Sequence, residues 1–527
     1  MIKLSEIEWG PIDAADPDED FLEKFIEPQE IKSLIGEDIC LIPGEKGSGK
    51  TALCKALELR YRQRFSGLST IRFDDLEFSP VVKGLSELSS LTSIDRFTFI
   101  ANYWQYVLIV NAMKEYFSRK SMNLSVAETR IKSYLLKHHL VESGPLSIML
   151  FLCTQCWVIM SSLTDPKKLR DPGLEIMPSN LEPQVIEELK KYPIFDLEFS
   201  EAQKDFADIL RKKKERVLIT LDGLDRLNTK SDDKLKENLQ IIFDGLGQSV
   251  YDLSISNRFK NLIQIKCMIP YDRFIRLNIR DLDKLMAKTQ GIRWSYESLQ
   301  SFLARRIARH PKYRHLTSFK HLWSELFPET LRNKFYEINE DTFEYILRHT
   351  MYRPRHLQVH LLKLARRYPD SNMDKTMIAK SIRESCKELA ETYIKEYEVD
   401  HPNLEAFLKK LRKVPNVMPY RDFRKIVKNM LRLFDVKMDV DKKVDTLYQM
   451  SFFGVIVFLQ ADDDRIERVY RYTPPRKTGV PPYRVDFHYT ESKVSVTSEL
   501  REDDLIAIHP IFFDYCQQKP HDSYIVG

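Results

Sequence analysis

The sequence predicts an α/β protein in which a core of short parallel strands is followed by a mainly helical second half. Two apolar runs of strand length, Ile39–Ile42 and Val217–Leu221, each lead into a glycine-containing turn. From Ser295 onward the apolar residues recur with helical spacing, and a pair of strands returns only near the end. The chain has 527 residues, enough for about three or four domains.

Composition and charge narrow the class of protein. Apolar residues make up 43% and charged residues 30% of the chain, which excludes a wholly disordered protein. The net charge is only +5, so a nucleic-acid site would have to be a local basic patch. The 7 cysteines are scattered and odd in number, and the first residues lack a secretory signal pattern. These features favour a cytoplasmic protein with reduced thiols.

Glycine is scarce, yet three of the 16 glycines fall within the eight residues Gly44-Glu-Lys-Gly-Ser-Gly-Lys-Thr51. This Walker A pattern lies between an apolar strand and a helical run, which is the context that the motif requires. Loop amides without Cβ obstruction can approach phosphate, Lys50 would contact the β- and γ-phosphates, and the Thr51 hydroxyl would bind Mg²⁺. We therefore expect ATP and Mg²⁺ to be bound. The expected nucleotide-binding residues are Gly44, Glu45, Lys46, Gly47, Ser48, Gly49, Lys50, Thr51 and Ala52.

A P-loop site also needs an acidic residue at the end of a neighbouring buried strand. Asp222 follows Val217–Leu221 directly, at the edge where ligands bind in open α/β sheets. We expect Asp222 to hold Mg²⁺ together with Thr51, either directly or through water. Asp225 lies one turn further along and could orient the attacking water.

Other cations could also contact phosphate. A third strand is expected at Leu262–Ile269. Lys266 on it and Arg273 after it are candidates for sensing the γ-phosphate, and a position on a solvated face is the alternative for each. Residues 352–367 contain five cations and no acid, and arginine forks suit the phosphates of ATP or of DNA. A basic helix face balanced by acids elsewhere is the alternative. The five cations are Arg353, Arg355, Lys363, Arg366 and Arg367.

About 165 residues separate the two halves of this site, and residues 91–194 have mostly helical spacing. We interpret them as a helical insertion, with residues 71–73 before it as a further strand. Two uncharged stretches, Phe97–Met113 and Ser143–Thr164, are interpreted as buried helices rather than membrane spans. A single crossing would separate the two halves of one nucleotide site. The pair Cys153 and Cys156 is interpreted as buried thiols.

The phosphate loop and the strand end Asp222-Gly-Leu-Asp225 resemble those of bacterial P-loop ATPases related to the STAND and AAA+ classes. The resemblance extends to residues 291–295 and to Tyr352-Arg-Pro-Arg-His356, which is similar to a sensor-2 element in a helical lid. It implies that Arg353 or Arg355 contacts the γ-phosphate. It also implies a nucleotide-driven switch in bacterial regulation or antiphage defence, working as a homo-oligomer or with an effector protein. Arg226 stands where such proteins usually have an acid, which implies slow or partner-dependent turnover.

The C-terminal part predicts three helices and then a strand pair, which is the order of a winged helix. The helices are expected at 404–413, 420–434 and 440–452, and the strands at 454–459 and 483–489. Basic residues outnumber acids in 404–435, so this stretch could bind DNA through phosphates, or it could serve protein contacts. Ser295 is expected to be a simple N-cap of the first lid helix, because Ser298 replaces the acid of a capping box.

The predicted architecture is thus an α/β P-loop NTPase core with a helical insertion, a helical lid and a C-terminal winged-helix domain. The residues assigned to catalysis are Lys50, Asp222, Asp225, Arg353 and Arg355. Two alternatives stay open: an origin-recognition-like DNA-binding ATPase and a non-hydrolysing, nucleotide-gated scaffold. The expected parts are an N-terminal linker (1–30), the first core part (31–90), the insertion (91–194), the second core part (195–290), the lid (291–400) and the winged-helix-like domain (401–527).

Overall fold

The chain divides into two compact units, and the N-terminus belongs with the C-terminal part of the chain. We call Ala14–Ile292 the N-terminal unit, and Met1–Asp13 together with Arg293–Gly527 the C-terminal unit. The computed structural model describes residues 3–10, 21–25, 39–72, 93–118, 124–138, 140, 197–224, 233–369, 373–398, 401, 403–460, 466, 481–491 and 495–526.

The N-terminal unit is built on a four-stranded parallel sheet with the order β1-β4-β3-β2. Both faces of this sheet are covered, which explains why β3 and β4 are buried along their whole length. The sequence prediction of these strands is confirmed to within a few residues. The strands are β1 (Leu41–Gly44), β2 (Gly67–Arg72), β3 (Val217–Asp222) and β4 (Ile263–Pro270).

A further extended segment, residues 288–292, runs parallel to β1 along its free edge. The amides of Cys40 and Gln290 donate to the carbonyls of Lys288 and Leu41, at 2.9 and 3.1 Å. Leu41 and Thr289 form a parallel bridge. The last residues of the N-terminal unit therefore lie beside the strand that leads into the phosphate loop.

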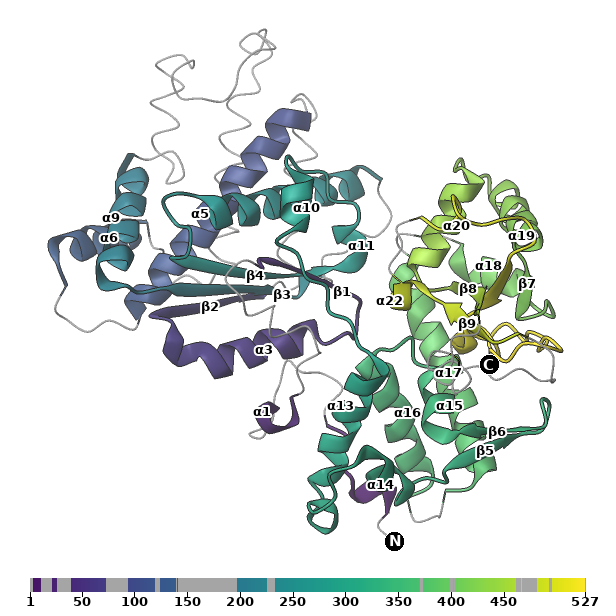
Figure 1. Ribbon diagram of the computed structural model, residues 1–527. Helices are drawn as coiled ribbons and strands as arrows, with labels where there is room; N and C mark the ends of the chain where they lie inside the picture. The colour runs from purple at the N-terminus through teal and green to yellow at the C-terminus, as the bar shows by residue number, and fades with distance from the viewer. Residues whose placement is uncertain are drawn as a thin grey trace. The chain divides into compact units, whose positions relative to one another are not determined.

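Helices cover the two faces of the sheet (Figure 1): α3 (Lys50–Tyr61) lies on one face, and α5 (Ser93–Ser118) and α10 (Asp233–Ile255) lie on the other. The two long helices approach each other closely. The Ser249 hydroxyl donates to the Ala101 carbonyl at 2.5 Å, and Trp104 Nε1 donates to the Ile242 carbonyl at 3.1 Å. The other helices formed by the described residues of this unit are α1 (Phe21–Lys24), η2 (Arg62–Arg64), α6 (Val126–Lys137), α9 (Leu197–Lys213), α11 (Tyr271–Phe274) and α12 (Leu282–Met286).

The start of the predicted insertion shares the hydrophobic core of the sheet. Trp104, Val107 and Met113 of α5 are fully buried in the same cluster as Ile219 of β3. The interpretation of Phe97–Met113 as a buried helix is thus confirmed. Within the described ranges, no helix combines the length and the apolar character that a membrane crossing needs. Ser143–Thr164, with Cys153 and Cys156, lies outside the described residues.

The first part of the C-terminal unit is helical with one short hairpin. Ser295 was predicted to be a simple N-cap, but the structure shows a full capping box in which Ser295 and Ser298 bond each other's backbone amides. The Ser298 hydroxyl accepts from the Ser295 amide at 2.8 Å, as a carboxylate would. The elements are η1 (Leu4–Glu6), α13 (Tyr296–Ala308), η6 (Pro311–Tyr313), α14 (Phe319–Ser324), β5 (Thr330–Asn333), β6 (Ile338–Asp341), α15 (Thr342–Leu347), α16 (Pro354–Arg367) and α17 (Lys375–Tyr397).

The described residues of the last part form several helices and a four-stranded antiparallel sheet with the order β7-β10-β8-β9. The predicted helices and the β8–β9 pair are present. However, β10 lies between β7 and β8, so the winged-helix assignment stays a prediction. The elements are α18 (Leu404–Lys410), β7 (Val417–Pro419), α19 (Tyr420–Leu433), α20 (Val440–Gln449), β8 (Phe453–Phe458), β9 (Tyr483–Asp486), α22 (His488–Glu491), β10 (Leu505–Ile508) and η7 (Pro510–Phe512).

Candidate nucleotide-binding site

The phosphate loop joins the carboxyl end of β1 to the first turn of α3. Gly49, the residue before the helix, has φ 101°, a left-handed conformation that residues with a Cβ rarely adopt. A Cβ on Gly44 would lie 2.7 Å from Ser48 Oγ, so this glycine lets the loop close tightly. The clustered glycines of the sequence are thus required by the backbone. They leave the N-terminus of α3, with its free amides, at the carboxyl edge of the sheet.

Lys50 is folded back over the loop. Its ammonium group donates to the carbonyls of Gly44 and Glu45 at 2.9 and 3.1 Å, and only 6% of the residue is exposed. Two backbone carbonyls therefore hold this cation at the mouth of the loop. Phosphate oxygens would be stronger acceptors for it than neutral carbonyls.

Asp222 is the last residue of β3 and is 4% exposed. β4 lies between β3 and β1, and Cys267 of β4 is in register with both Leu41 and Leu221. The end of β3 and the phosphate loop are therefore about 10 Å apart, two strand spacings, at the same edge of the sheet. This separation leaves room for a cation and a phosphate group between them. A carboxylate and a hydroxyl, Asp222 and Thr51, form a donor set that suits Mg²⁺.

The first turns of α3 pack against the end of β3. Cys54 of α3 is fully buried, and its thiol hydrogen-bonds to Thr220. Burial raises the pKa of Cys54 to about 12, and the nearby Asp222 carboxylate adds to the increase. The thiol is therefore a packing group rather than a nucleophile.

Sequence reasoning missed Arg72, the last residue of β2, which is in register with Asp222. The pairing depends on which strand lies beside β3, and about 150 residues separate the two positions. The sequence signal was limited to the position of Arg72 within the expected strand 71–73, which does not say which strand it faces.

The structure corrects the prediction for Lys266. Lys266 is in register with Thr220, two residues before Asp222, and it does not lie at the carboxyl edge. Its ammonium group donates to the Ile39 carbonyl at 2.5 Å, and the residue is 2% exposed. The ammonium group of Lys266 is therefore bound by a backbone carbonyl just before β1, away from the carboxyl edge of the sheet. Arg273 pairs with Asp272 at 3.4 Å and is 6% exposed.

The other predicted site residues are Asp225, Arg353 and Arg355. Asp225 is outside the described residues. Arg353 and Arg355 belong to the C-terminal unit, where Arg353 is the N-cap of α16 and is 4% exposed. Burial, with Arg353 close by, lowers the pKa of His356 and of His509 well below the usual value. The contact of either arginine with a phosphate stays a prediction.

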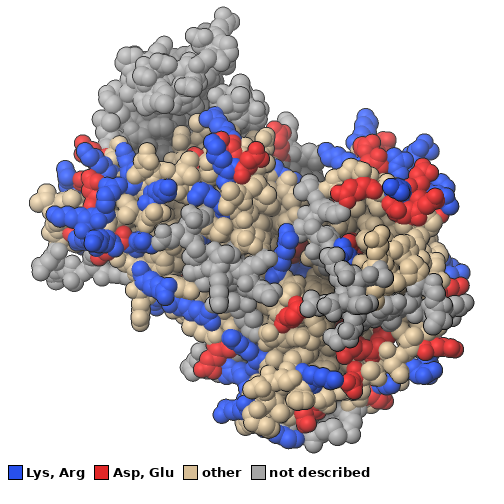
Figure 2. Space-filling model, viewed as in Figure 1, with Lys and Arg blue, Asp and Glu red and all other residues tan. Residues whose placement is uncertain are grey.

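The two basic stretches are partly neutralised by neighbouring acids. In 404–435, ion pairs join Arg421 to Asp503 at 2.6 Å and Arg424 to Asp441 at 2.8 Å. On the face drawn in Figure 2, cationic and anionic side chains stand side by side, including the part formed by α19 and α20. In 352–367, Lys363 pairs with Glu388 and Arg367 with Glu384.

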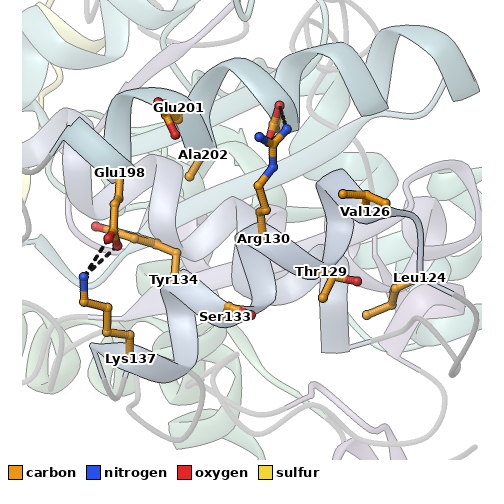
Figure 3. A pocket seen from close by; sticks show the side chains of 11 residues that line it. Leu124, Val126, Thr129, Arg130, Ser133, Tyr134, Lys137, Glu198, Glu201 and Ala202 are labelled. Atoms are coloured by element: carbon orange, nitrogen blue, oxygen red, sulfur yellow. Dashed lines mark hydrogen bonds and ion pairs between the residues drawn. The ribbon is translucent and has the colours of Figure 1, made fainter.

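A separate groove lies between α6 and α9 (Figure 3), and its lining includes none of the predicted site residues. Ion pairs bridge it at two places: Arg130 contacts Asp205 at 2.8 Å, and Lys137 contacts Glu198 at 2.7 Å. Ion pairs between its own lining residues therefore cross the groove and join α6 to α9.

The family model that matches this chain covers only part of it. A family model described as the FunZ-associated C-terminal helical domain matches residues 297–396, which is less than a fifth of the chain. Among solved structures, the Walker-type ATPase PABY2304 of Pyrococcus abyssi is 12% identical, with 92% of this chain and 99% of that chain covered and a TM-score of 0.34. No curated protein matches the sequence.

Proposed function

We propose that this protein is a Mg²⁺-dependent P-loop ATPase that binds and hydrolyses ATP and acts as a nucleotide-driven switch. The observation that carries the proposal is the placement of two elements at one edge of the sheet. The glycine loop Gly44–Thr51 follows β1, and Asp222 ends β3 on the other side of β4.

Different residues of the site would bind the phosphates and the Mg²⁺ ion. Loop amides and the N-terminus of α3 would donate to phosphate oxygens, and Lys50 would move from the carbonyls that hold it to the β- and γ-phosphates. Thr51 and Asp222 would hold Mg²⁺. The ion, when bound, neutralises charge on the β- and γ-phosphate oxygens.

Turnover is expected to be slow or dependent on a partner. Asp225 is the proposed residue that orients water, and Arg226 follows it in place of a second acid. A non-hydrolysing scaffold is the alternative for the same site. It predicts tight ATP binding with a phosphate-release rate that is equal in the wild type and in Asp222→Ala.

The binding claim is tested by the effect of Mg²⁺·ATP on the melting temperature. Wild type should be stabilised as ligand concentration rises, and Lys50→Ala should lose this shift. Lys55→Ala is the matched control, because Lys55 lies on the same helix and pairs only with Glu58 among the described residues, at 2.9 Å. An equal shift in Lys50→Ala and wild type would show that the site is wrongly assigned.

We further propose that the nucleotide state repositions the helical lid and the winged-helix-like domain, in bacterial regulation or antiphage defence, as a homo-oligomer or with an effector protein. This part rests on the family resemblance of the loop, the β3 end and the Arg353–Arg355 segment. The particle mass measured by light scattering with ADP and with a non-hydrolysable ATP analogue tests it. Equal mass and equal effector binding in both states would contradict the switch.

DNA is a second candidate partner, through 404–435 and 352–367. It is favoured by five exposed cations in the first stretch that form no ion pair with any described residue: Lys410, Arg412, Lys413, Lys428 and Arg432. One observation argues against DNA. Asp445 on α20, the third helix of this part, accepts hydrogen bonds from residues 495–497, so an acidic side chain of this helix is used in a contact within the protein. If duplex DNA does not stimulate the ATPase and shows no salt-dependent binding, DNA is excluded as a partner.

A further inference from the structure

Arg72 stands beside Asp222 on the face of the sheet that carries α3. The side-chain hydroxyls of Thr70 and Thr220 lie 2.9 Å apart, so these registered residues point to the same face. That face is the α3 side, because the Cys54 thiol of α3 contacts Thr220. Side chains alternate along a strand, so Arg72 and Asp222, two residues further on, return to the α3 face.

The two side chains start one strand spacing apart, about 4.8 Å, at the carboxyl ends of their strands. Both charges act on the same buried thiol, since Asp222 raises and Arg72 lowers the pKa of Cys54. Arg72 is thus directed toward the first turns of the helix that follows the phosphate loop.

Arg72 is exposed, and within the described part of the chain it forms no hydrogen bond or ion pair. The neighbouring cations, in contrast, have partners. Lys50 is held by two carbonyls, and Arg273 pairs with Asp272. A planar guanidinium beside a phosphate site matches phosphate oxygens in a two-point hydrogen bond.

We propose that Arg72 is a catalytic residue that contacts the terminal phosphate of bound ATP from the β2 side and stabilises the charge that develops there during hydrolysis. This inference rests on the proposed function. Water adds to the γ-phosphorus, the bond to the β–γ bridging oxygen breaks, and its electron pair leaves with ADP. The water proton passes to the released phosphate or to solvent. The guanidinium stays protonated throughout and only donates hydrogen bonds, as arginines acting in cis do in other phosphoryl-transfer sites.

The test uses the full chain with Arg72→Ala, Arg72→Lys and the control Arg64→Ala. Arg64 follows α3 at the end remote from the phosphate loop and stacks on Tyr61 at 4.9 Å. We expect Arg72→Ala to lower kcat by about 100-fold or more, with KM and the Kd for ADP within about twofold of wild type. Arg72→Lys should recover part of the loss, and Arg64→Ala should match wild type.

A second measurement tests the role of Arg72 without requiring measurable turnover. ADP with aluminium fluoride, a mimic of the transferring phosphoryl group, should raise the melting temperature of wild type beyond ADP alone, and Arg72→Ala should lose only that extra increase. Three results for Arg72→Ala would overturn this role of Arg72. They are a kcat within threefold of wild type, an unchanged fluoride-dependent increase in melting temperature, or a loss of ADP affinity together with an equal loss of stability in the absence of nucleotide. A wild type that ignores ATP and ADP altogether would instead refute the proposed function.

Discussion

The backbone amide of Ile292 donates a hydrogen bond to the carbonyl of Pro43, at 2.9 Å. Pro43 is the residue before Gly44, where the phosphate loop begins, and Ile292 is the last residue before the chain enters the C-terminal unit. One of the two covalent connections between the units is therefore anchored to the strand that positions the loop.

Removing that amide should weaken nucleotide binding. Ile292→Pro deletes the donor and leaves the Pro43 carbonyl unpaired, at an expected cost of about 1–3 kcal/mol in unfolding free energy. We also expect a several-fold rise in the Kd for ADP, measured by calorimetry. Ile292→Ala keeps the amide and is the matched control. If both variants bind ADP equally well, the hydrogen bond does not support the loop.

The loop glycines should tolerate no side chain. Gly44→Ala would place a Cβ 2.7 Å from Ser48 Oγ and 3.2 Å from Lys50 Cγ, so the loop must open. We expect the melting shift produced by Mg²⁺·ATP to be lost. Gly291→Ala, where the nearest atom to the added Cβ is the Pro43 carbonyl oxygen at 3.6 Å, should keep the shift. Retention of ATP binding in Gly44→Ala would contradict the loop geometry.

Two glycines on α10 offer a matched pair that tests the packing of the core. A Cβ on Gly245 would lie 2.5 Å from Ile100 Cγ2 and 3.1 Å from the Ala101 amide nitrogen of α5. A Cβ on Gly247 would meet Leu277 at an ordinary 3.5 Å. Gly245→Ala should lower the unfolding free energy by about 1–3 kcal/mol. Gly247→Ala should be neutral or stabilising by up to about 1 kcal/mol. Denaturant unfolding that ranks the two variants in the opposite order would contradict the close approach of α5 and α10.

The pairing of α6 with α9 should depend on pH through Glu128. Its side chain is 2% exposed and accepts from Lys213 at 2.7 Å and from the Ser125 amide at 3.0 Å. Burial alone would raise the pKa of Glu128, but the hydrogen bonds from Lys213 and Ser125 outweigh it and lower the pKa to about 2.

The sign of the pH effect follows from that direction. The folded state lowers the pKa of Glu128 below its unfolded value, so the contribution is fully present above about pH 5 and is lost as the pH falls toward 2. The difference in unfolding free energy between wild type and Glu128→Gln should therefore shrink over this range. Glu198→Gln, in an ion pair whose carboxylate is 52% exposed, is the control and should show little effect. A difference that is constant from pH 7 to pH 3 would contradict the pairing.

The parts of the site that the sequence predicted are those with local signals. Gly44, Gly49 and Lys50 belong to one contiguous loop, and Asp222 follows an apolar run that is long enough for a central strand. The residues that were missed or misplaced depend on register between distant strands. Arg72 meets Asp222 only because β2 pairs with β3, and Lys266 falls short of the edge only because of how β4 aligns with β3.

The same limit applies to the fold. The segment 288–292 reads Lys-Thr-Gln-Gly-Ile, with no apolar alternation, and it is ordered by backbone hydrogen bonds to β1. The three-residue strand β7 is too short to show a period, and its pairing with β10 joins positions more than 80 residues apart. Ser298 completes a capping box with a hydroxyl, which the usual pattern of an acid at that position did not predict.

The central claim is that Mg²⁺·ATP is held between the phosphate loop and Asp222, and calorimetric titration tests it most directly. ATP is titrated into wild type and into Asp222→Asn, each with Mg²⁺ and with a chelator. We predict that Mg²⁺ strengthens ATP binding to wild type at least tenfold and that Asp222→Asn loses this gain while keeping the weaker, metal-free affinity. Equal Mg²⁺ dependence in the two proteins, or no ATP binding by wild type, would contradict the account.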